Sequence, residues 1–545
     1  MSSAGDRMNP EGRSGRLLAV YDLSCSPTSY DCLTFLALAE MKRRSGRYRC
    51  FDVVFVPAEG AGFWNKEATS LSEKQWRLRN LLVPMCWLWP ACSSVSLLGS
   101  RGEADRLVKT AGRHVFPERY RVSAPIAEAF QLAHVLAARA CGEAMPAWEA
   151  PSRARELVAA WLEPRARGRR VVVITLREAS YQSVRNSSLE RWTDFARRLD
   201  PQRYLAVFVR DTERAFEPLP DAYKAFETFP TASISLAVRA ALYEASFLSM
   251  MSSGGPANLL FFNPRCHGVI CDLLLPSEPR SSATVMRSLG LEIGRQAPLL
   301  GVTRHLVWDQ PKPAELFDAF SRLVGIIEGA PARSTRQTLQ DAEPPLRLAR
   351  RLRETGRYAA SWRIYTHEAS RLQRPAAALC GLSLIALELP PPCYRGWPRV
   401  KRRLFYYRRK VVGAYYFARA RRARLDQWQG TDEGLEIALC LESWNRHSAA
   451  RAIYRAILDQ DPAEPTAHYR LALDARDRGD RDEAIRELAS ALASDPHSGR
   501  FHLAMAEILA SGGESASARS HYVMALSCDP SIKVPAEIRA GAAQS

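Results

Sequence analysis

The stretch PTAHYRLALDARDRGDRDEAIRELASALASDP, residues 465–496, decides the fold of the last third of the chain because its pattern returns at a fixed interval. Pro462, Pro496 and Pro530 are spaced 34 residues apart. The same step relates Gly479 to Gly513, Ala484 to Ala518, Ala491 to Ala525 and Leu488 to Tyr522, and one period earlier it reaches Ala450 and Tyr454. A period of this length predicts paired helices that bury their apolar faces only by stacking on neighbouring pairs.

The repeated unit resembles the tetratricopeptide repeat, in which small residues lie inside paired helices and a proline follows the second helix. The resemblance implies a helical solenoid over residues 345–540 that recruits a protein partner. Residues 348–369, with Gly356, Tyr358 and Tyr365, predict a further helical hairpin, and residues 434–462 predict another. Any chemistry of the protein is therefore expected upstream of the solenoid.

Composition places the chain among soluble, multidomain proteins. It has 545 residues, of which 47% are hydrophobic and 25% charged, and no run of about 18 apolar residues is present. The polar residues 1–15 predict a disordered tail and not a secretion signal. The twelve cysteines form no CxxC pair and have no zinc-site spacing. We therefore predict a cytoplasmic protein that holds no metal or other cofactor.

The region before the solenoid predicts two consecutive Rossmann-like α/β units, residues 16–165 and 166–335, followed by a linker at 336–344. RLLAVYDL, CLTFLALAEMKRR and FDVVFVP follow one another as strand, helix and strand. The second unit repeats the alternation from RRVVVITLRE onward. The fold class is thus α/β plus all-α. AEGAGFW, after the second strand, has no third glycine at the spacing of a dinucleotide site, which argues against a nicotinamide or flavin site.

Two segments of the second unit combine residue types that bind phosphate. The first, VVVITLREASYQSVRNSS, ends a strand in charged and polar side chains, whose guanidinium groups suit phosphate oxygens. The second, SSGGPANLL, is a glycine turn between a strand and a helix, where the backbone can approach a ligand closely. Both segments also have a structural explanation: the charged residues of the first could form ion pairs at the end of the sheet, and the second could be an ordinary turn between a strand and a helix. The candidate donor-binding residues are Arg177, Glu178, Tyr181, Arg185, Asn186, Ser253, Gly254, Gly255, Pro256 and Asn258.

In this order, the two segments resemble the donor half of GT-B glycosyltransferases, most closely bacterial enzymes of surface-polysaccharide and heptose transfer. The resemblance covers residues 165–330, and over residues 16–165 it is one of architecture only. It implies that Arg177, Arg185 and the turn at 253–256 hold the diphosphate of a nucleotide sugar, with Trp308 and Asp309 as a further loop. The turn lacks the acidic residue that heptosyltransferases place before it, so their substrate is not carried over.

Sugar transfer to a surface-polysaccharide, lipid-linked or protein acceptor also needs a general base for the acceptor hydroxyl. Asp22, Asp31 and Glu59 follow strands of the first unit and are the candidates, although each also suits a helix cap or a surface position. The rival hypothesis is a non-catalytic repeat scaffold with a degenerate α/β region.

Net charge is +18, and it is concentrated in one place. Residues 395–424, within a basic aromatic insertion near 390–430, carry twelve Arg or Lys and no acidic residue. An irregular solenoid segment, peripheral contact with the anionic inner membrane and an acidic or nucleic-acid partner remain open. Nucleic acid is disfavoured because no recognised nucleic-acid module accompanies the charge.

Overall fold

The computed structural model describes residues 15–60, 62–64, 69–126, 131–180, 182–217, 220–275, 278–329, 343–372, 375–389 and 399–542. The predictions for the tail before Gly15, for Tyr181, for most of the linker and for residues 390–398 lie outside these ranges. The described chain divides into two compact units. One comprises residues up to 135, 143–273 and 296–338, and the other 136–142, 274–295 and 339 onward.

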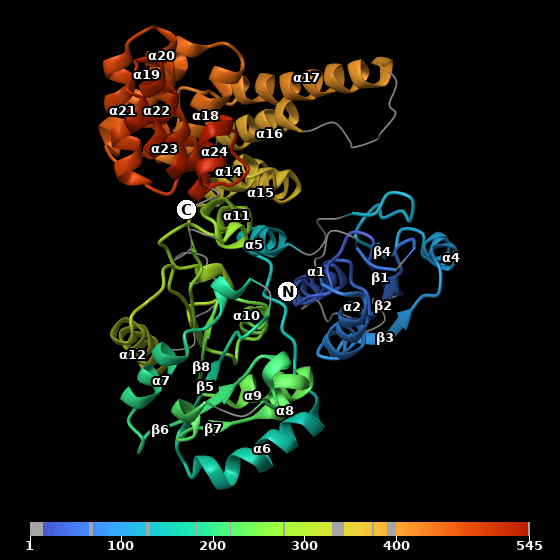
Figure 1. The fold of residues 1–545 in the computed structure, drawn as a ribbon. Helices are drawn as coiled ribbons and strands as arrows, with labels where there is room; N and C mark the ends of the chain where they lie inside the picture. Colours follow the sequence, from blue (N-terminus) through green and yellow to red (C-terminus); the bar gives the residue numbers. More distant parts are fainter. Residues whose placement is uncertain are drawn as a thin grey trace, which may run out of the picture. The chain divides into compact units, whose positions relative to one another are not determined.

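The first unit contains two parallel sheets, drawn in blue and green in Figure 1. The smaller has the order β3-β2-β1-β4, formed by β1 (Arg16–Asp22), β2 (Cys50–Val56), β3 (Cys92–Leu97) and β4 (Val115–Phe116). Its strands are joined or followed by α1 (Asp31–Ser45), α2 (Leu71–Arg77), a π-helical turn (Leu78–Leu82), α3 (Val83–Cys86) and α4 (Arg101–Ala111), and then by α5 (Leu132–Ala140) and α6 (Ser152–Ala166). The predicted strand-helix-strand unit is therefore present.

The larger sheet has the order β10-β9-β8-β5-β6-β7, again with every pairing parallel. Its strands are β5 (Arg170–Thr175), β6 (Tyr204–Val209), β7 (Glu227–Thr228), β8 (Leu248–Ser252), β9 (Gly268–Cys271) and β10 (Arg304–Leu306). The helices are α7 (Leu189–Arg198), α8 (Pro230–Ile234), α9 (Leu236–Ala245), α10 (Ala257–Phe261) and α12 (Pro313–Gly329), whereas α11 (Ala283–Ser288) belongs to the second unit. Read from β7, the order is that of a doubly wound Rossmann-type sheet.

The strands of this sheet carry apolar side chains that must be buried, and helices bury them. Val172, Ile174, Phe208 and Met250 pack with Leu316 and other apolar side chains of α7 and α12 into one core. Continuous apolar runs of this kind are typical of parallel strands, since helices cover both faces of the sheet. This core stabilises the observed strand order, and the strand order determines which loops lie next to each other at the end of the sheet.

The second unit is built mainly from antiparallel helix pairs. They are α14 (Pro345–Glu354), α15 (Tyr358–Arg371), α16 (Ala376–Glu388), α17 (Arg399–Arg422), α18 (Gly430–Ser443), α19 (His447–Gln460), α20 (Pro465–Asp477), α21 (Arg481–Ser494), α22 (Gly499–Ser511), α23 (Ser515–Cys528) and α24 (Ala536–Ala542). Helix pairing accounts for the 34-residue period. Gly479 and Gly513 turn the chain within successive pairs with φ of 84° and 85°, a region that favours glycine.

The repeated small residues lie where two helices approach closely. Ala484, Ala491 and Ala525 are fully buried, and Ala518 is nearly so. The basic insertion predicted near 390–430 is a helix over much of its length, because Arg399–Arg422 forms α17 and pairs with α16. Residues 399–422 of the segment considered irregular are therefore helical.

Candidate functional site

The candidate site lies where the order of the larger sheet reverses, between β5 and β8. These strands pair in register, with Thr175 opposite Met251, so the loops that follow them leave the sheet side by side. In open α/β sheets, ligands bind in the crevice beyond the carboxyl ends of strands at such a reversal. Both phosphate-type segments of the sequence therefore meet at one edge.

Arg177 and Asn186 join the two ends of the loop after β5. The Arg177 guanidinium donates to Asn186 Oδ1 at 2.5 Å, and the same oxygen accepts from the Ala179 amide at 3.1 Å. Ser187 closes the loop by accepting from the Arg177 amide at 2.9 Å. The arginine is thus presented at the sheet edge by a hydrogen-bonded loop.

Arg185 connects this loop to the glycine turn after β8. Its Nη2 donates to the Ser253 carbonyl at 3.2 Å, and its Nη1 to Gln182 Oε1 at 3.3 Å. Below them, the hydroxyls of Ser187 and Ser252 are 3.4 Å apart. The structure therefore brings Arg177, Arg185, Asn186 and Ser253 together, and their role in binding a donor stays a prediction.

The backbone of the glycine turn lies close to Tyr30 of the first sheet's region, although the sequence suggested close approach to a ligand. A Cβ at Gly255 would lie 2.5 Å from Cδ2 of Tyr30, and a Cβ at Gly254 would meet nothing nearer than 3.8 Å. The Asn258 amide donates to the Tyr30 carbonyl at 3.3 Å. Pro256 precedes α10, which has only five residues. A helix this short gives little macrodipole for anion binding, so the backbone at 253–255 would have to supply the donors.

Glu178 lies beside the other candidates but faces a different partner. Its carboxylate accepts from Arg210 at 2.7 and 3.0 Å in a buried pair. Of the remaining candidates, Trp308 is buried and Asp309 exposed, and the Asp309 carbonyl accepts from the Asp272 amide at 3.4 Å after β9. Trp308 and Asp309 therefore follow β10 and lie beside the end of β9, not in the loop after β5 that carries Arg177.

A cavity of about 280 Å³ opens at the carboxyl ends of β6 and β7. Three of its nine lining residues are aromatic, namely Phe208, Phe216 and Phe229; the others are the polar Arg210, Glu217, Thr228 and Ser233, with Ala215 and Pro230. Ser233 is 4% exposed, and its hydroxyl has no hydrogen-bond partner among the described residues. Because Glu178 pairs with Arg210, the cavity wall is tied to the chain segment that carries Arg177.

The three carboxylates proposed as general bases differ in environment. Asp22 accepts from both Nη atoms of Arg101 at 3.0 Å and from the Tyr120 hydroxyl at 2.5 Å. Burial would raise the pKa of Asp22, but hydrogen bonds from Arg101, Ser24 and Tyr120 outweigh it and lower that pKa. Proton transfer to Asp22 would therefore require loss of an ion pair that anchors the loops after β1 and β4.

Asp31 and Glu59 lie after β1 and β2 of the smaller sheet. The Asp31 carboxylate accepts from the Ser29 hydroxyl at 2.8 Å at the start of α1, and Glu59 is exposed after β2. Their assignment as acceptor-side bases remains a prediction.

Sequence reasoning missed two arginines at this edge. Arg210 directly follows β6, as Arg177 follows β5, so the rule that found one could have found the other. Arg239, on α9, is buried and donates to the carbonyls of Ala232 and Ser233 and to the Tyr30 hydroxyl. No local sequence pattern marks it, because Tyr30, one of its partners, lies 209 residues away in the sequence.

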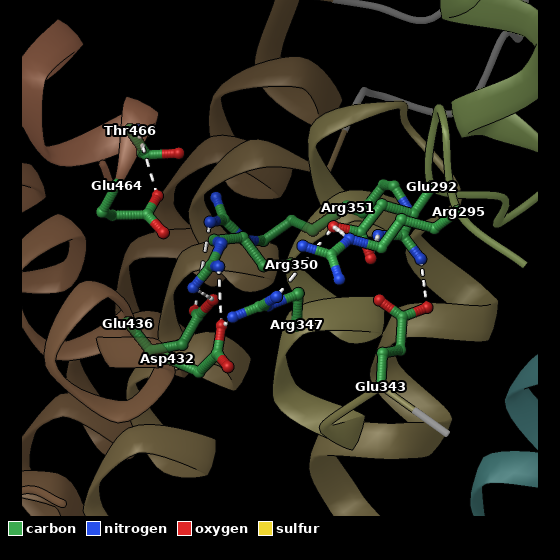
Figure 2. A network of polar contacts seen from close by, with 11 residues as sticks. Glu292, Arg295, Glu343, Arg347, Arg350, Arg351, Asp432, Glu436, Glu464 and Thr466 are labelled. Atoms are coloured by element: carbon green, nitrogen blue, oxygen red, sulfur yellow. Dashed lines mark hydrogen bonds and ion pairs between the residues drawn. The ribbon is translucent and has the colours of Figure 1, made fainter. Parts of the chain in front are cut away.

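The second unit contains a network of buried and half-buried charges, shown in Figure 2. Arg350 on α14 pairs with Asp432 at 2.8 Å and with Glu436 at 3.8 Å, both on α18. Burial raises the pKa of Glu436, and Arg353 and Arg350 oppose that rise. The network continues from α14 through Arg347 and Arg351 to Glu292, in the segment after α11. It joins non-adjacent helices and this segment within the unit.

The described ranges contain neither a metal-ligand cluster nor a membrane span. No group of three or more His, Cys, Asp or Glu there could hold a metal ion. No helix among the same residues has both the length and the apolar character needed to cross a membrane.

Comparison with known proteins identifies the repeats. Residues 469–531 match the family model described as tetratricopeptide repeat. Similar solved structures include YrrB, a TPR protein with an unusual peptide-binding site (15% identity, 38% of this chain, 95% of that chain, TM-score 0.22). Others are MamA from Desulfovibrio magneticus RS-1 (15%, 35%, 99%, 0.22) and a thermophilic TPR protein in Thermus thermophilus (20%, 37%, 96%, 0.24). Scores this low carry no argument. No curated protein matches the chain.

The family match and the helix pairs agree on the C-terminal region. It contains tetratricopeptide repeats, which indicate protein–protein interaction. The region before it is an α/β fold with parallel sheets.

Proposed function

We propose that the protein binds a nucleotide sugar in the crevice between β5 and β8 and transfers the sugar to an acceptor recruited with the help of the solenoid. The observation that carries the proposal is the strand order, because it brings Arg177, Arg185 and Asn186 to the reversal point of the larger sheet. Two guanidinium groups beside a glycine turn form a donor set that suits a diphosphate.

The cavity beside this crevice supports the assignment of the ligand class. Phe208, Phe216 and Phe229 line it with aromatic surface, and Ser233 offers a hydroxyl for hydrogen bonding. Phe208 is buried in the core and Phe229 stacks on Trp161, so a planar base would lie against the exposed ring of Phe216 and accept or donate a hydrogen bond at the buried Ser233 hydroxyl. The base would lie at β6 and β7, with the diphosphate toward β5 and β8.

In the proposed reaction, the acceptor oxygen becomes bonded to the anomeric carbon of the sugar, the bond from that carbon to the diphosphate oxygen breaks, and the nucleoside diphosphate leaves with growing negative charge. Arg177 and Arg185 would stabilise that charge from fixed positions, which lowers the barrier without reorganisation. A guanidinium forms stronger hydrogen bonds with anionic phosphate oxygens than with neutral acceptors such as the Asn186 and Ser253 oxygens. A carboxylate such as Asp31 or Glu59 would accept the proton of the acceptor hydroxyl.

A non-catalytic scaffold is the second candidate, and one observation favours it. Arg177, Arg185 and Gly255 all have contacts within the protein, so each is explained without a ligand. Partner binding by the repeats would then be the whole function.

Thermal unfolding with UDP-, GDP-, ADP- and CMP-sugars separates the two. A ligand at about 100 times its Kd adds roughly 2.7 kcal/mol to the free energy of unfolding. We expect stabilisation by one nucleotide class, lost in Arg177→Ala and retained in Arg197→Ala, an exposed arginine of α7 paired with Asp194. Absence of stabilisation by all four in the folded full-length protein would favour the scaffold.

A further inference from the structure

The outer face of α17 has no assigned role and carries a distinct chemistry. This helix of 24 residues belongs to the segment 395–424, where twelve Arg or Lys occur without one acidic residue. A helix of this length spans about 36 Å. In Figure 1 it runs beside α16 in the upper part of the view.

The inner face of α17 is firmly packed, which fixes the orientation of the helix. The Ser383 hydroxyl of α16 donates to the Gly413 carbonyl at 2.9 Å, and Arg409 donates to the Ala386 carbonyl at 3.2 Å. Phe417 stacks on Trp444 with ring centroids 5.3 Å apart. Rotation about the helix axis would break all three contacts, so the opposite face is constrained to point outward.

That outward face is apolar and aromatic along its centre. Tyr407, Val411 and Tyr415 recur every four residues and are 69%, 50% and 57% exposed. Ala414 and Ala418 are exposed between and beyond them. Large apolar side chains with this exposure on one helix face require an explanation, because isolated exposed residues are common but continuous stripes are not.

Basic residues flank the stripe on both sides. At about 100° per residue, Lys410 and Arg421 fall on one flank, and Arg408 and Arg419 on the other. All four are exposed. The Arg419 guanidinium lies over the Tyr415 ring, 5.7 Å from its centroid, so charge and ring share one surface. An apolar centre between two cationic flanks is the pattern of a helix lying in the plane of a membrane interface.

We propose that α17 binds an anionic lipid surface with its axis parallel to the membrane plane. Tyr407, Val411 and Tyr415 would enter the headgroup boundary while the flanking cations contact lipid phosphates. Charge complementarity selects this occupant, since the segment 395–424 is purely cationic and would repel a second copy of itself. The proposal does not depend on the donor site of the α/β region.

Single-stranded nucleic acid is the strongest alternative occupant. Proteins bind it in a positively charged groove that follows the backbone, with aromatic rings stacking on the bases. The α17 face is one convex helix whose cations lie beside the stripe and whose centre includes Val411 and two alanines. Those aliphatic side chains offer no stacking surface, and they suit lipid better.

Vesicle sedimentation of the full-length protein tests the proposal. We expect binding to vesicles of about 30% phosphatidylglycerol in phosphatidylcholine at about 0.1 M NaCl, little binding to pure phosphatidylcholine, and release at about 0.5 M NaCl. Each basic residue near an anionic surface strengthens binding roughly five-fold. Replacement of Arg408, Lys410, Arg419 and Arg421 by Gln should therefore weaken binding by roughly 10²-fold or more.

Two further variants separate the stripe from general charge. Changing Tyr407, Val411 and Tyr415 to Ser keeps every charge and should still weaken binding by about ten-fold or more. Changing the exposed Arg455, Arg476, Arg486 and Arg519 to Gln removes equal charge elsewhere in the same unit and should leave binding within about three-fold. Matching circular dichroism spectra would show that all variants are folded.

The proposal is overturned if the α17 variants bind vesicles as the control variant does, or if wild type does not bind anionic vesicles. Stronger binding to a mixed-sequence single-stranded RNA than to the vesicles, lost in the same variants, would assign the face to nucleic acid instead.

Discussion

Gly255 provides the sharpest test of what the glycine turn does. Tyr30 contacts this residue closely, so Gly255→Ala would place a Cβ 2.5, 3.0 and 3.2 Å from Cδ2, Cγ and Cβ of Tyr30. These atoms are at the root of the tyrosine side chain and cannot swing away. Overpacking of this kind costs about 1–3 kcal/mol of the free energy of unfolding.

Gly254→Ala is the matched control. It adds the same methyl group one residue earlier, where the nearest atom is 3.8 Å away. Neither glycine has a positive φ, so alanine is permitted at both. The control should be neutral or stabilised by up to about 1 kcal/mol, because alanine reduces the entropy of the unfolded chain.

Differential scanning calorimetry of the full-length protein measures the difference. At about 2–4 °C per kcal/mol, the α/β transition should fall by about 2–10 °C in Gly255→Ala and stay unchanged or rise slightly in Gly254→Ala. In a Tyr30→Ala background, Gly255→Ala should cost much less than it does in the wild type, since contacting residues are not additive. Equal transitions for the two glycine variants, or full additivity with Tyr30→Ala, would refute the reasoning.

Three more outcomes follow from the same structure. Because folding lowers the pKa of Asp22, the contribution of Asp22 to the free energy of unfolding is fully present above its ordinary pKa of 3.8. That contribution is lost as pH falls through the lower pKa of the folded state. Asp22→Asn should therefore lower the free energy of unfolding by about 3 kcal/mol at about pH 7 and by clearly less at about pH 3 in urea titrations; equal losses would contradict the ion pair. His502 and His521 meet at 3.0 Å, and burial is the main cause that lowers the pKa of both. Unfolded histidines then bind protons more readily, so the protection factors of amides in α22 and α23, which correct for the intrinsic slowing of exchange at lower pH, should decrease as pH falls from about 7 to 5.5. His521→Glu copies the pair of His468 with Glu487 one repeat earlier and should suppress that decrease; an unchanged pH response would argue against it. Gly381→Ala would meet the buried Tyr365 ring at 2.3 Å and should cost about 1–3 kcal/mol, whereas Gly325→Ala, with nothing within 4 Å, should be neutral or stabilising in thermal unfolding. Equal unfolding temperatures for Gly381→Ala and Gly325→Ala would show that the Tyr365 ring can move to accommodate a methyl group at residue 381.

The repeats were predictable from the sequence because their information is local and periodic. Gly479, Ala484 and Leu488 recur in kind at a fixed step, and each keeps its structural position in the next helix pair. The strands were predictable for a similar reason, since VVVIT and LAVFV are apolar runs bounded by polar turns. Strand order was not visible locally, yet it decides that Arg177 and Ser253 meet.

The site was harder to predict wherever contacts are long-range. Glu178 was grouped with Arg177 because they are adjacent in sequence, and the structure pairs it with Arg210. Gly255 was interpreted as room for a ligand, while Tyr30, from a distant part of the sequence, occupies that room. The basic segment did not indicate a regular helix, because its apolar residues are divided between an inner face and an exposed stripe.

The most direct test of the central claim is hydrogen exchange of the full-length protein with and without a saturating nucleoside diphosphate, preferably the one selected by thermal unfolding. A ligand in the proposed crevice should slow exchange of backbone amides in the loops after β5 and β8, near residues 177–188 and 253–258. The same protection should be absent in Arg177→Ala. Protection confined to other segments, or none at any concentration tested, would contradict the proposed site.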